Sequence, residues 1–259
     1  MQEITNKLKI MPQIVNPHAI LDGYFIDFPT ISIVNSTFGL GITLQDQDLL
    51  GFPKFLYKPK LGTSFSNNKD LIGYDVPVLI HTKYDICKGI VAILGQDALR
   101  DPKDPLLNGI NTTNDIVVGL PYAIAFDRNY KQVAVYHNLI KDILDAGYDV
   151  YLTDIWKSWD AYHNSRLGRW TNGNSHKQCL DAEFNGTCIN ISYIVLMGGI
   201  AQNKFKTILN TTNIIDIRVP HLSPSANGIW KNKLGGKPIN EPNKIDYVKN
   251  EMRKNGIQV

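Results

Sequence analysis

Side chains that could take part in acid–base or hydrogen-bonding chemistry stand just after short apolar runs of this sequence. Gln96 and Asp97 follow one such run, Asp154 follows a second and His221 follows a third. Because the carboxyl ends of parallel strands meet at one edge of a sheet, we expect these groups to converge there. Tyr122 follows the turn residues Gly-Leu-Pro and would bring an aromatic ring to the same edge.

The elements that must position these groups are four buried strands. Short apolar runs bounded by turn residues are typical of strands buried on both faces of a parallel sheet. The runs are 89–95, 149–153, 192–198 and 214–219. Helical patterns separate them, and strand–helix–strand alternation implies right-handed crossovers. The sequence therefore predicts a three-layer α/β/α fold with a central, mostly parallel four-stranded sheet.

Three segments have the apolar spacing of helices. The segment 130–146 carries one apolar stripe and stops at Gly147, a residue suited to the left-handed turn after a helix. A second stripe falls at 201–209. Near the end of the sequence, Pro242 suits a first helical turn and Gly256 a helix end.

Length and composition fit one domain over residues 1–259. The chain has 259 residues and 43% hydrophobic residues, enough for one sizeable core. Residues 1–75 lack sustained periodicity and are expected to form an irregular N-terminal layer, and the polar stretch 160–190 is expected to be an insertion.

Cysteine content and hydropathy predict the cellular compartment, whereas the net charge says little about a binding partner. Three cysteines make a poor disulfide framework, and no run approaches the length of a membrane span, so a cytoplasmic location without a membrane partner is expected. The net charge is only +3, but residues 217–240 contain no acidic residue. Their basic residues are Arg218, Lys231, Lys233 and Lys237. They suit a phosphate backbone, although by themselves they favour a solvated surface.

Five segments, in order, resemble the motifs of the uracil-DNA-glycosylase superfamily. Gly95–Arg100 resembles the motif G-Q-D-P-Y-H, and Gly119–Ile124 resembles G-L-A-F-S-V. Val150–Lys157 resembles V-Y-I-T-N-V-V-K, Met197–Gln202 resembles W-G-S-H-A-Q, and His221–Ala226 resembles H-P-S-P-L-S. Each match is weak alone, and the order gives the set its weight. The resemblance implies a monofunctional DNA glycosylase that flips a base out of DNA and hydrolyses its N-glycosidic bond.

The resemblance also implies roles for the residues at the strand ends. Asp97 would hold the attacking water and face the positive charge that develops on the sugar, and His221 would donate a hydrogen bond to the base O2. Tyr122 would stack on the flipped base. Gln96 and Asp154 would contact the base, together with Arg100.

Other residues of the matched segments would contact the DNA outside the base. Ser223, Ser225 and Lys231 would hold phosphates. The superfamily's leucine wedge, which fills the space left by the flipped base, has no large apolar counterpart at 225–227. We expect Trp230 or Ile229 to substitute for it.

Two departures from the motifs point to a cytosine enlarged at carbon 5. Ala98-Leu99-Arg100 replaces the segment whose tyrosine excludes groups at that carbon, and Asp154 replaces an asparagine that reads the base edge. A carboxylate accepts from the cytosine amino group and repels the uracil O4. The chain looks like the bacteriophage-replication-inhibition glycosylases, which act on glucosylated 5-hydroxymethylcytosine. Its expected partner is phage DNA, double- or single-stranded, bound by a monomer.

Alternatives remain open at this point. A uracil-repair glycosylase would require Asp154 to lie outside the base site, and a non-catalytic nucleic-acid binder would need neither Asp97 nor His221. Singly, Asp97 could cap a helix, Tyr122 could be core and His221 could bond a backbone carbonyl. Asp154 could pair with Lys157 or Arg100.

No cofactor is expected. The sequence has no G-x-G-x-x-G, G-x-x-x-x-G-K-[ST] or G-x-S-x-G motif, and three cysteines cannot supply the four thiolates of the cluster found in some superfamily branches. His163, His176, Cys179 and Cys188 lie close in sequence, but their spacing follows no common zinc finger. We therefore expect no metal, while a zinc site on these four residues stays an open alternative.

Overall fold

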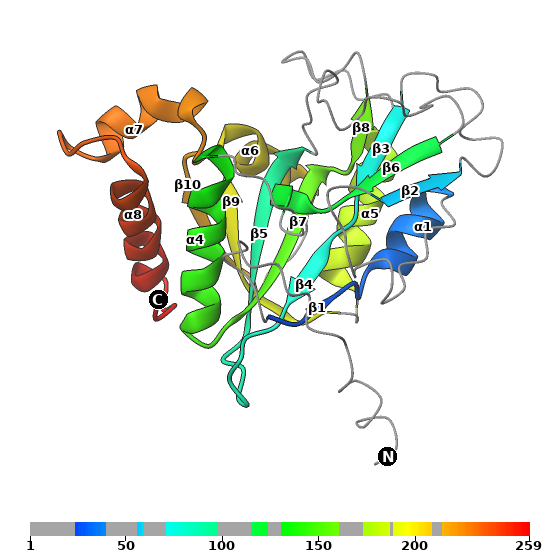
Figure 1. Cartoon of the computed structure of the whole chain (residues 1–259), viewed down its shortest axis with the longest axis horizontal. Helices are drawn as coiled ribbons and strands as arrows, with labels where there is room; N and C mark the ends of the chain where they lie inside the picture. The colour runs from blue at the N-terminus through cyan, green and yellow to red at the C-terminus, as the bar shows by residue number, and fades with distance from the viewer. Residues whose placement is uncertain are drawn as a thin grey trace.

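A six-stranded mixed sheet forms the centre of the protein (Figure 1). This computed structural model describes residues 24–39, 56–59, 71–97, 115–123, 131–160, 173–186, 189–208 and 214–259. The strands, in spatial order, are β1 (Ile26–Asp27), β4 (Val78–Ile80), β7 (Asp149–Trp156), β5 (Ile90–Asp97), β9 (Ile191–Met197) and β10 (Ile215–Val219). Strands β7, β5, β9 and β10 are parallel to one another, whereas β4 pairs antiparallel with both β7 and β1.

The α/β class is confirmed, but the predicted four-stranded sheet is too small. The four strands predicted from apolar runs are the four parallel strands of the sheet. The prediction missed β4 and β1, which have three and two residues. Strands that short carry no detectable alternation, so only their pairing with β7 and with each other identifies them.

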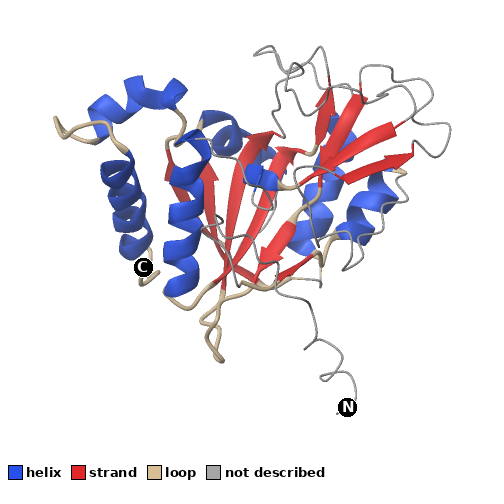
Figure 2. Ribbon diagram, viewed as in Figure 1, coloured by secondary structure: helices blue, strands red, loops and turns tan. Residues whose placement is uncertain are grey.

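Helices cover both faces of the sheet because alternate strand residues point to opposite sides. Val91 and Ile93 of β5 belong to one core cluster with α4 (Lys131–Asp145) and α8 (Glu241–Lys254). Ala92 and Leu94 belong to a second cluster with residues of α5 (Gly173–Asn185) and α6 (Gly199–Ile208). Figure 2 shows α4 in front of the strands and α5 and α6 behind them. A strand buried on both faces therefore reads as a continuous apolar run.

The helix ends follow the predicted signals. Helix α4 is followed by Gly147 at φ 92°, and α8 by Gly256 at φ 90°. The side chain of Asn240 caps α8 by accepting from the Asn243 amide at 3.0 Å. Among the described residues, no helix has both the length and the apolar character needed to cross a bilayer.

A second sheet of four strands adjoins the first at its upper right in Figure 1. Its order is β2 (Leu56–Pro59), β6 (Asp115–Gly119), β3 (Leu71–Asp75) and β8 (Ser158–Asp160). Helix α1 (Ile31–Phe38) packs beside α5. The irregular layer predicted for residues 1–75 is thus wrong for the described part, because β1, α1, β2 and β3 lie in it. Helix α5, whose Leu180 and Phe184 are core residues, lies inside the predicted insertion 160–190.

Candidate active site

The carboxyl ends of β5 and β7 bring Asp154 against Gly95. The two residues are partners across these parallel strands, and Asp154 is buried. A Cβ atom on Gly95 would overlap the Asp154 Oδ1 atom and lie 2.8 Å from the Tyr122 Oη atom. The carboxylate and the phenol therefore both lie close to a residue that has no side chain, and any larger residue there would displace one or both of them.

Tyr122 reaches this point from η2 (Pro121–Ala123), a short 3-10 helix that follows β6. Its φ of 58° is the only positive φ of a non-glycine residue in the described part of the chain. Such a conformation costs free energy and persists where the surroundings hold it. The His137 Nε2–H group of α4 donates to the Tyr122 carbonyl at 3.2 Å, and the Tyr122 hydroxyl contacts the Met197 sulfur at 3.9 Å.

Tyr136 joins Tyr122 to His221. Its ring lies 4.8 Å from the Tyr122 ring, centre to centre, and 5.7 Å from the His221 imidazole in an edge-on arrangement. The Tyr136 hydroxyl lies 3.1 Å from Nδ1 and 3.3 Å from Nε2 of His221. A continuous chain of contacts therefore runs from Asp154 through two tyrosines to His221.

The loop after β10 defines the tautomer of His221. The Ser223 amide lies 3.3 Å from Nδ1 and can only donate to it, so Nδ1 accepts and the ring proton is on Nε2. The Ser223 hydroxyl also contacts Nδ1 at 2.7 Å and the Ser225 hydroxyl at 2.6 Å. Burial and the charge of Lys244 lower the pKa of His221. The imidazole is therefore a neutral hydrogen-bond donor through Nε2.

Contacts to backbone groups hold this loop in place. The Trp230 Nε1–H group donates to the His221 carbonyl at 2.9 Å, and the Lys244 ammonium donates to the Leu222 carbonyl at 3.0 Å. Gly198, at φ 88°, lies so close that a Cβ atom on it would be 3.3 Å from the His221 Cβ. The position of the imidazole thus depends on β9, α7 (Asn227–Lys233) and α8 together.

The two tyrosines of the site stay protonated. Burial and the charge of Asp154 raise the pKa of Tyr122. Burial also raises the pKa of Tyr136, against a smaller opposite effect of the Ser223 and Leu222 backbone groups. Both phenols can therefore act as hydrogen-bond donors at neutral pH, and neither is suited to act as a base.

The structure brings together three of the residues predicted to converge: Tyr122, Asp154 and His221. Gln96 lies partly buried in β5, next to Gly95. Asp97 is the last residue of β5 and its backbone pairs with Trp156, while its side chain lies outside the described residues. Arg100 lies wholly outside them.

The predicted DNA contacts fall into two groups. Lys231, Lys233 and Lys237 are exposed around α7 and form no ion pair with other described residues, whereas Arg218 pairs with Asp216 at 2.7 Å. Ser225 is exposed and Ser223 partly buried, beside His221.

Trp230 does not lie where a wedge must lie. The residue is 0% exposed, its indole is bonded to the His221 carbonyl, and its ring packs edge-on against Tyr247 at 5.4 Å. A side chain that enters a duplex has to be accessible, so the choice of Trp230 is corrected. Ile229, the other residue considered, is 52% exposed on the same helix.

Two of the four residues considered for zinc, His176 and Cys179, lie in the described part of the chain and contact other groups. The Lys157 amide donates to His176 Nδ1 at 3.2 Å, and burial lowers the pKa of His176 to about 3. The Cys179 thiol donates to Glu183 at 3.2 Å, and burial raises the pKa of that thiol. His163 and Cys188 lie outside the described residues, among which no three metal-binding side chains converge.

The same buried cluster bears on the pairing considered for Asp154. The Lys157 ammonium pairs with Glu183 at 2.9 Å and donates to the backbone carbonyl of Asp154 at 2.9 Å. The ion-pair partner of Lys157 in the structure is therefore Glu183, while Asp154 is held through its main chain.

Sequence reasoning missed three residues of the site. Tyr136 lies in the apolar stripe of the predicted helix 130–146 and is not predicted as a site residue, and His137 and Lys244 are not singled out. A tyrosine or a histidine on a buried helix face is a signal that a polar partner must exist. The partner itself could not be named, because Tyr136 and His221 are 85 residues apart.

Comparison with known proteins adds no family to this geometry. No protein-family model matches the chain, and no curated protein sequence matches it. The chemistry of the site is therefore inferred from its own residues.

Proposed function

We propose that the protein is a DNA N-glycosylase that excises a cytosine enlarged at carbon 5, with glucosylated 5-hydroxymethylcytosine of phage DNA as the preferred substrate. The observation that carries the proposal is the meeting of Asp154 and Tyr122 above Gly95. Neutral His221 is linked to them through Tyr136. The ordered motif resemblance supports the same activity, and helices on both faces of the sheet fit the three-layer fold that it implies.

The reaction breaks the bond between the sugar C1′ and the base nitrogen. The bonding electron pair leaves with the base, where negative charge collects on O2. The Nε2–H group of His221, which lies 3.3 Å from the Tyr136 hydroxyl in the free protein, would donate to that oxygen instead when the base is bound. Water adds its oxygen to C1′, and Asp97, which is proposed to face the sugar, takes the proton. The departing base takes up a proton from solvent and Asp97 returns its proton to solvent, so the products are a free base and an abasic site.

Asp154 determines the choice between cytosine and uracil in this proposal. A carboxylate accepts a hydrogen bond from the cytosine 4-amino group and repels the uracil O4. The uracil-repair alternative needs Asp154 away from the base, and its placement beside the Tyr122 phenol favours cytosine. Tyr122 would stack on the flipped base.

Excision assays on duplex oligonucleotides test the proposal. Each oligonucleotide carries one glucosylated 5-hydroxymethylcytosine, one unmodified cytosine or one uracil, and alkali cleaves the strand at any abasic site. We expect cleavage at the modified cytosine, its loss in Asp154→Asn and Asp97→Asn, and its retention in the exposed control Asp246→Asn. Cleavage at uracil alone would refute the substrate. Binding without cleavage of any substrate would favour the non-catalytic alternative.

Ile229 takes the proposed wedge role in place of Trp230, because it is the exposed apolar residue of α7. Ile229→Ala is expected to reduce excision on duplex DNA more than on single strands. Ile239→Ala removes another exposed isoleucine nearby and serves as the control. Equal losses on duplex and single-stranded DNA would contradict the wedge role.

A further inference from the structure

Helix α4 supplies two consecutive residues that contact different parts of the candidate site. Tyr136 contacts both aromatic groups, and His137 contacts the Tyr122 main chain. Neither residue belongs to the matched motifs. The contacts join chain segments that are 15 and 85 residues apart, so α4 is the element that both halves of the site share.

The Tyr136 phenol lies where it can orient the His221 ring. Its oxygen is within 3.3 Å of both ring nitrogens, and the phenol is buried beside the Leu222 and Ser223 backbone groups. Ser223 alone contacts only the Nδ1 side of the imidazole. The Tyr136 hydroxyl adds the second restraint that a planar ring needs in order to point Nε2 in one direction.

His137 restrains Tyr122 in a conformation that a non-glycine residue rarely adopts. The Tyr122 carbonyl only accepts hydrogen bonds, so the His137 Nε2 atom at 3.2 Å carries the proton. Burial lowers the pKa of His137, which keeps this ring neutral. A buried carbonyl that lost its donor would remain unsatisfied, and the strained φ of Tyr122 would lose a restraint.

We propose that Tyr136 and His137 are positioning residues: Tyr136 orients the His221 imidazole against the Tyr122 ring, and His137 holds Tyr122 in its left-handed conformation. The consequence for excision rests on the proposed function. The orientation of the two rings is a property of the free protein and can be measured without any substrate.

Tyr136→Phe tests the first half of the proposal, with Tyr148→Phe as the matched control. Tyr148 is also buried, and its hydroxyl accepts from the Gln258 amide at 3.3 Å, far from the site along β7. In NMR spectra of the free protein, the His221 ring signals should shift and broaden in Tyr136→Phe and stay in place in Tyr148→Phe. Single-turnover excision should fall about 10- to 100-fold in Tyr136→Phe, with the Kd for DNA unchanged.

A pair of substitutions at His137 tests the second half. The amide nitrogen of His137→Gln can take the place of Nε2, whereas His137→Leu has no donor. We expect the Tyr122 ring signals of the free protein to match the wild type in His137→Gln and to differ in His137→Leu. Excision should be retained in the first variant and reduced in the second.

The outcomes separate this proposal from the proposed function. If the wild type excises no base but the ring signals respond as described, the glycosylase activity is wrong and the positioning roles stand. Unchanged His221 signals and an unchanged excision rate in Tyr136→Phe would overturn the role of Tyr136. Equal behaviour of the two His137 variants would overturn the role of His137.

Discussion

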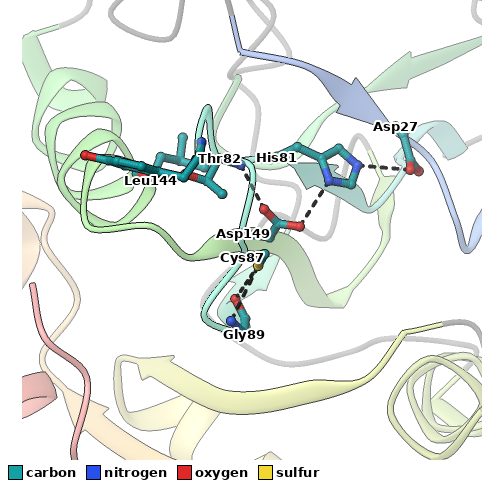
Figure 3. A network of polar contacts seen from close by, with 8 residues as sticks. Asp27, His81, Thr82, Cys87, Gly89, Leu144 and Asp149 are labelled. Atoms are coloured by element: carbon teal, nitrogen blue, oxygen red, sulfur yellow. Dashed lines mark hydrogen bonds and ion pairs between the residues drawn. The ribbon is translucent and has the colours of Figure 1, made fainter. Parts of the chain in front are cut away.

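Two histidines at opposite edges of the same sheet differ in charge: His81 is a cation and His221 is neutral. His221 lies at the carboxyl edge, where its partners are tyrosine and serine groups and the charge of Lys244 acts on it. His81 lies at the amino edge, where two carboxylates hold its ring (Figure 3). The sequence offers the same side chain at both places, and the neighbours decide what it does.

The His81 network is a charged clamp between three strands. Its Nδ1 atom lies 3.0 Å from Asp149 at the start of β7, and its Nε2 atom lies 3.2 Å from Asp27 at the end of β1. The Thr82 amide also donates to Asp149 at 2.8 Å. Burial by itself lowers the pKa of His81, but the two carboxylates outweigh it and raise that pKa to about 9.

The comparison separates a histidine that stabilises the fold from one suited to chemistry. A protonated ring between two carboxylates has no free donor and no free acceptor. A neutral ring whose Nε2–H group contacts only the uncharged Tyr136 hydroxyl can exchange that contact for an oxygen that gains negative charge. We therefore assign a structural role to His81 at the amino edge, and the carboxyl edge is where the proposed reaction would take place.

Removing the imidazole from one edge and then from the other should have the largest effect. His221→Ala is expected to reduce the excision rate about 100- to 1,000-fold, because it removes the donor to the departing base. His81→Ala should lower the thermal midpoint and leave the rate per folded molecule unchanged. Single-turnover kinetics and thermal unfolding of both variants check this. Full excision activity in His221→Ala would contradict the proposed role of His221 in the reaction.

A side chain added at Gly95 should destabilise the protein, because the carboxyl edge is crowded there. Gly95→Ala would force the Cβ atom into Asp154 and the Tyr122 hydroxyl, and overpacking of this kind costs about 1–3 kcal/mol of unfolding free energy. Excision should be lost as well. Gly199→Ala is the control, since a Cβ atom there would meet nothing within 4 Å. Denaturant unfolding measures both variants, and equal stability would show that the edge has room.

The amino edge should lose stability at alkaline pH, through the deprotonation of His81. The native pKa of His81 is about 9 and its ordinary value is 6.5, so its stabilisation is complete below 6.5 and is lost as the pH rises through 9. His81→Gln should lower the unfolding free energy by roughly 1 kcal/mol at neutral pH and by nothing at high pH. Urea titrations across this range measure the difference. A difference that stayed constant with pH would contradict the clamp.

The smallest effect is expected from Lys244, which supplies only part of the field around His221. Lys244→Met keeps the length of the side chain and removes its charge. The pKa of His221 should rise toward its ordinary value, because one of the two causes that lower it is gone. NMR titration of the imidazole measures this change. A fall in that pKa would show that Lys244 does not act through its charge.

The sequence by itself determined the parallel strands, the helix ends at Gly147 and Gly256, and the edge where Tyr122, Asp154 and His221 meet. These features follow from local patterns: apolar runs, left-handed turns and the position of a residue after a strand. The short strands β1 and β4 were not predicted, because two or three residues are too few to show an alternation of apolar and polar side chains.

Only the tertiary structure decided the state and partners of the polar groups. It buried Trp230, the expected wedge, and it brought Tyr136, a member of the core, into contact with the Tyr122 and His221 rings. It also made His81 a cation and His221 a neutral donor. The pKa of a histidine depends on burial and on charges contributed by distant segments, and the spacing of residues along a chain contains neither.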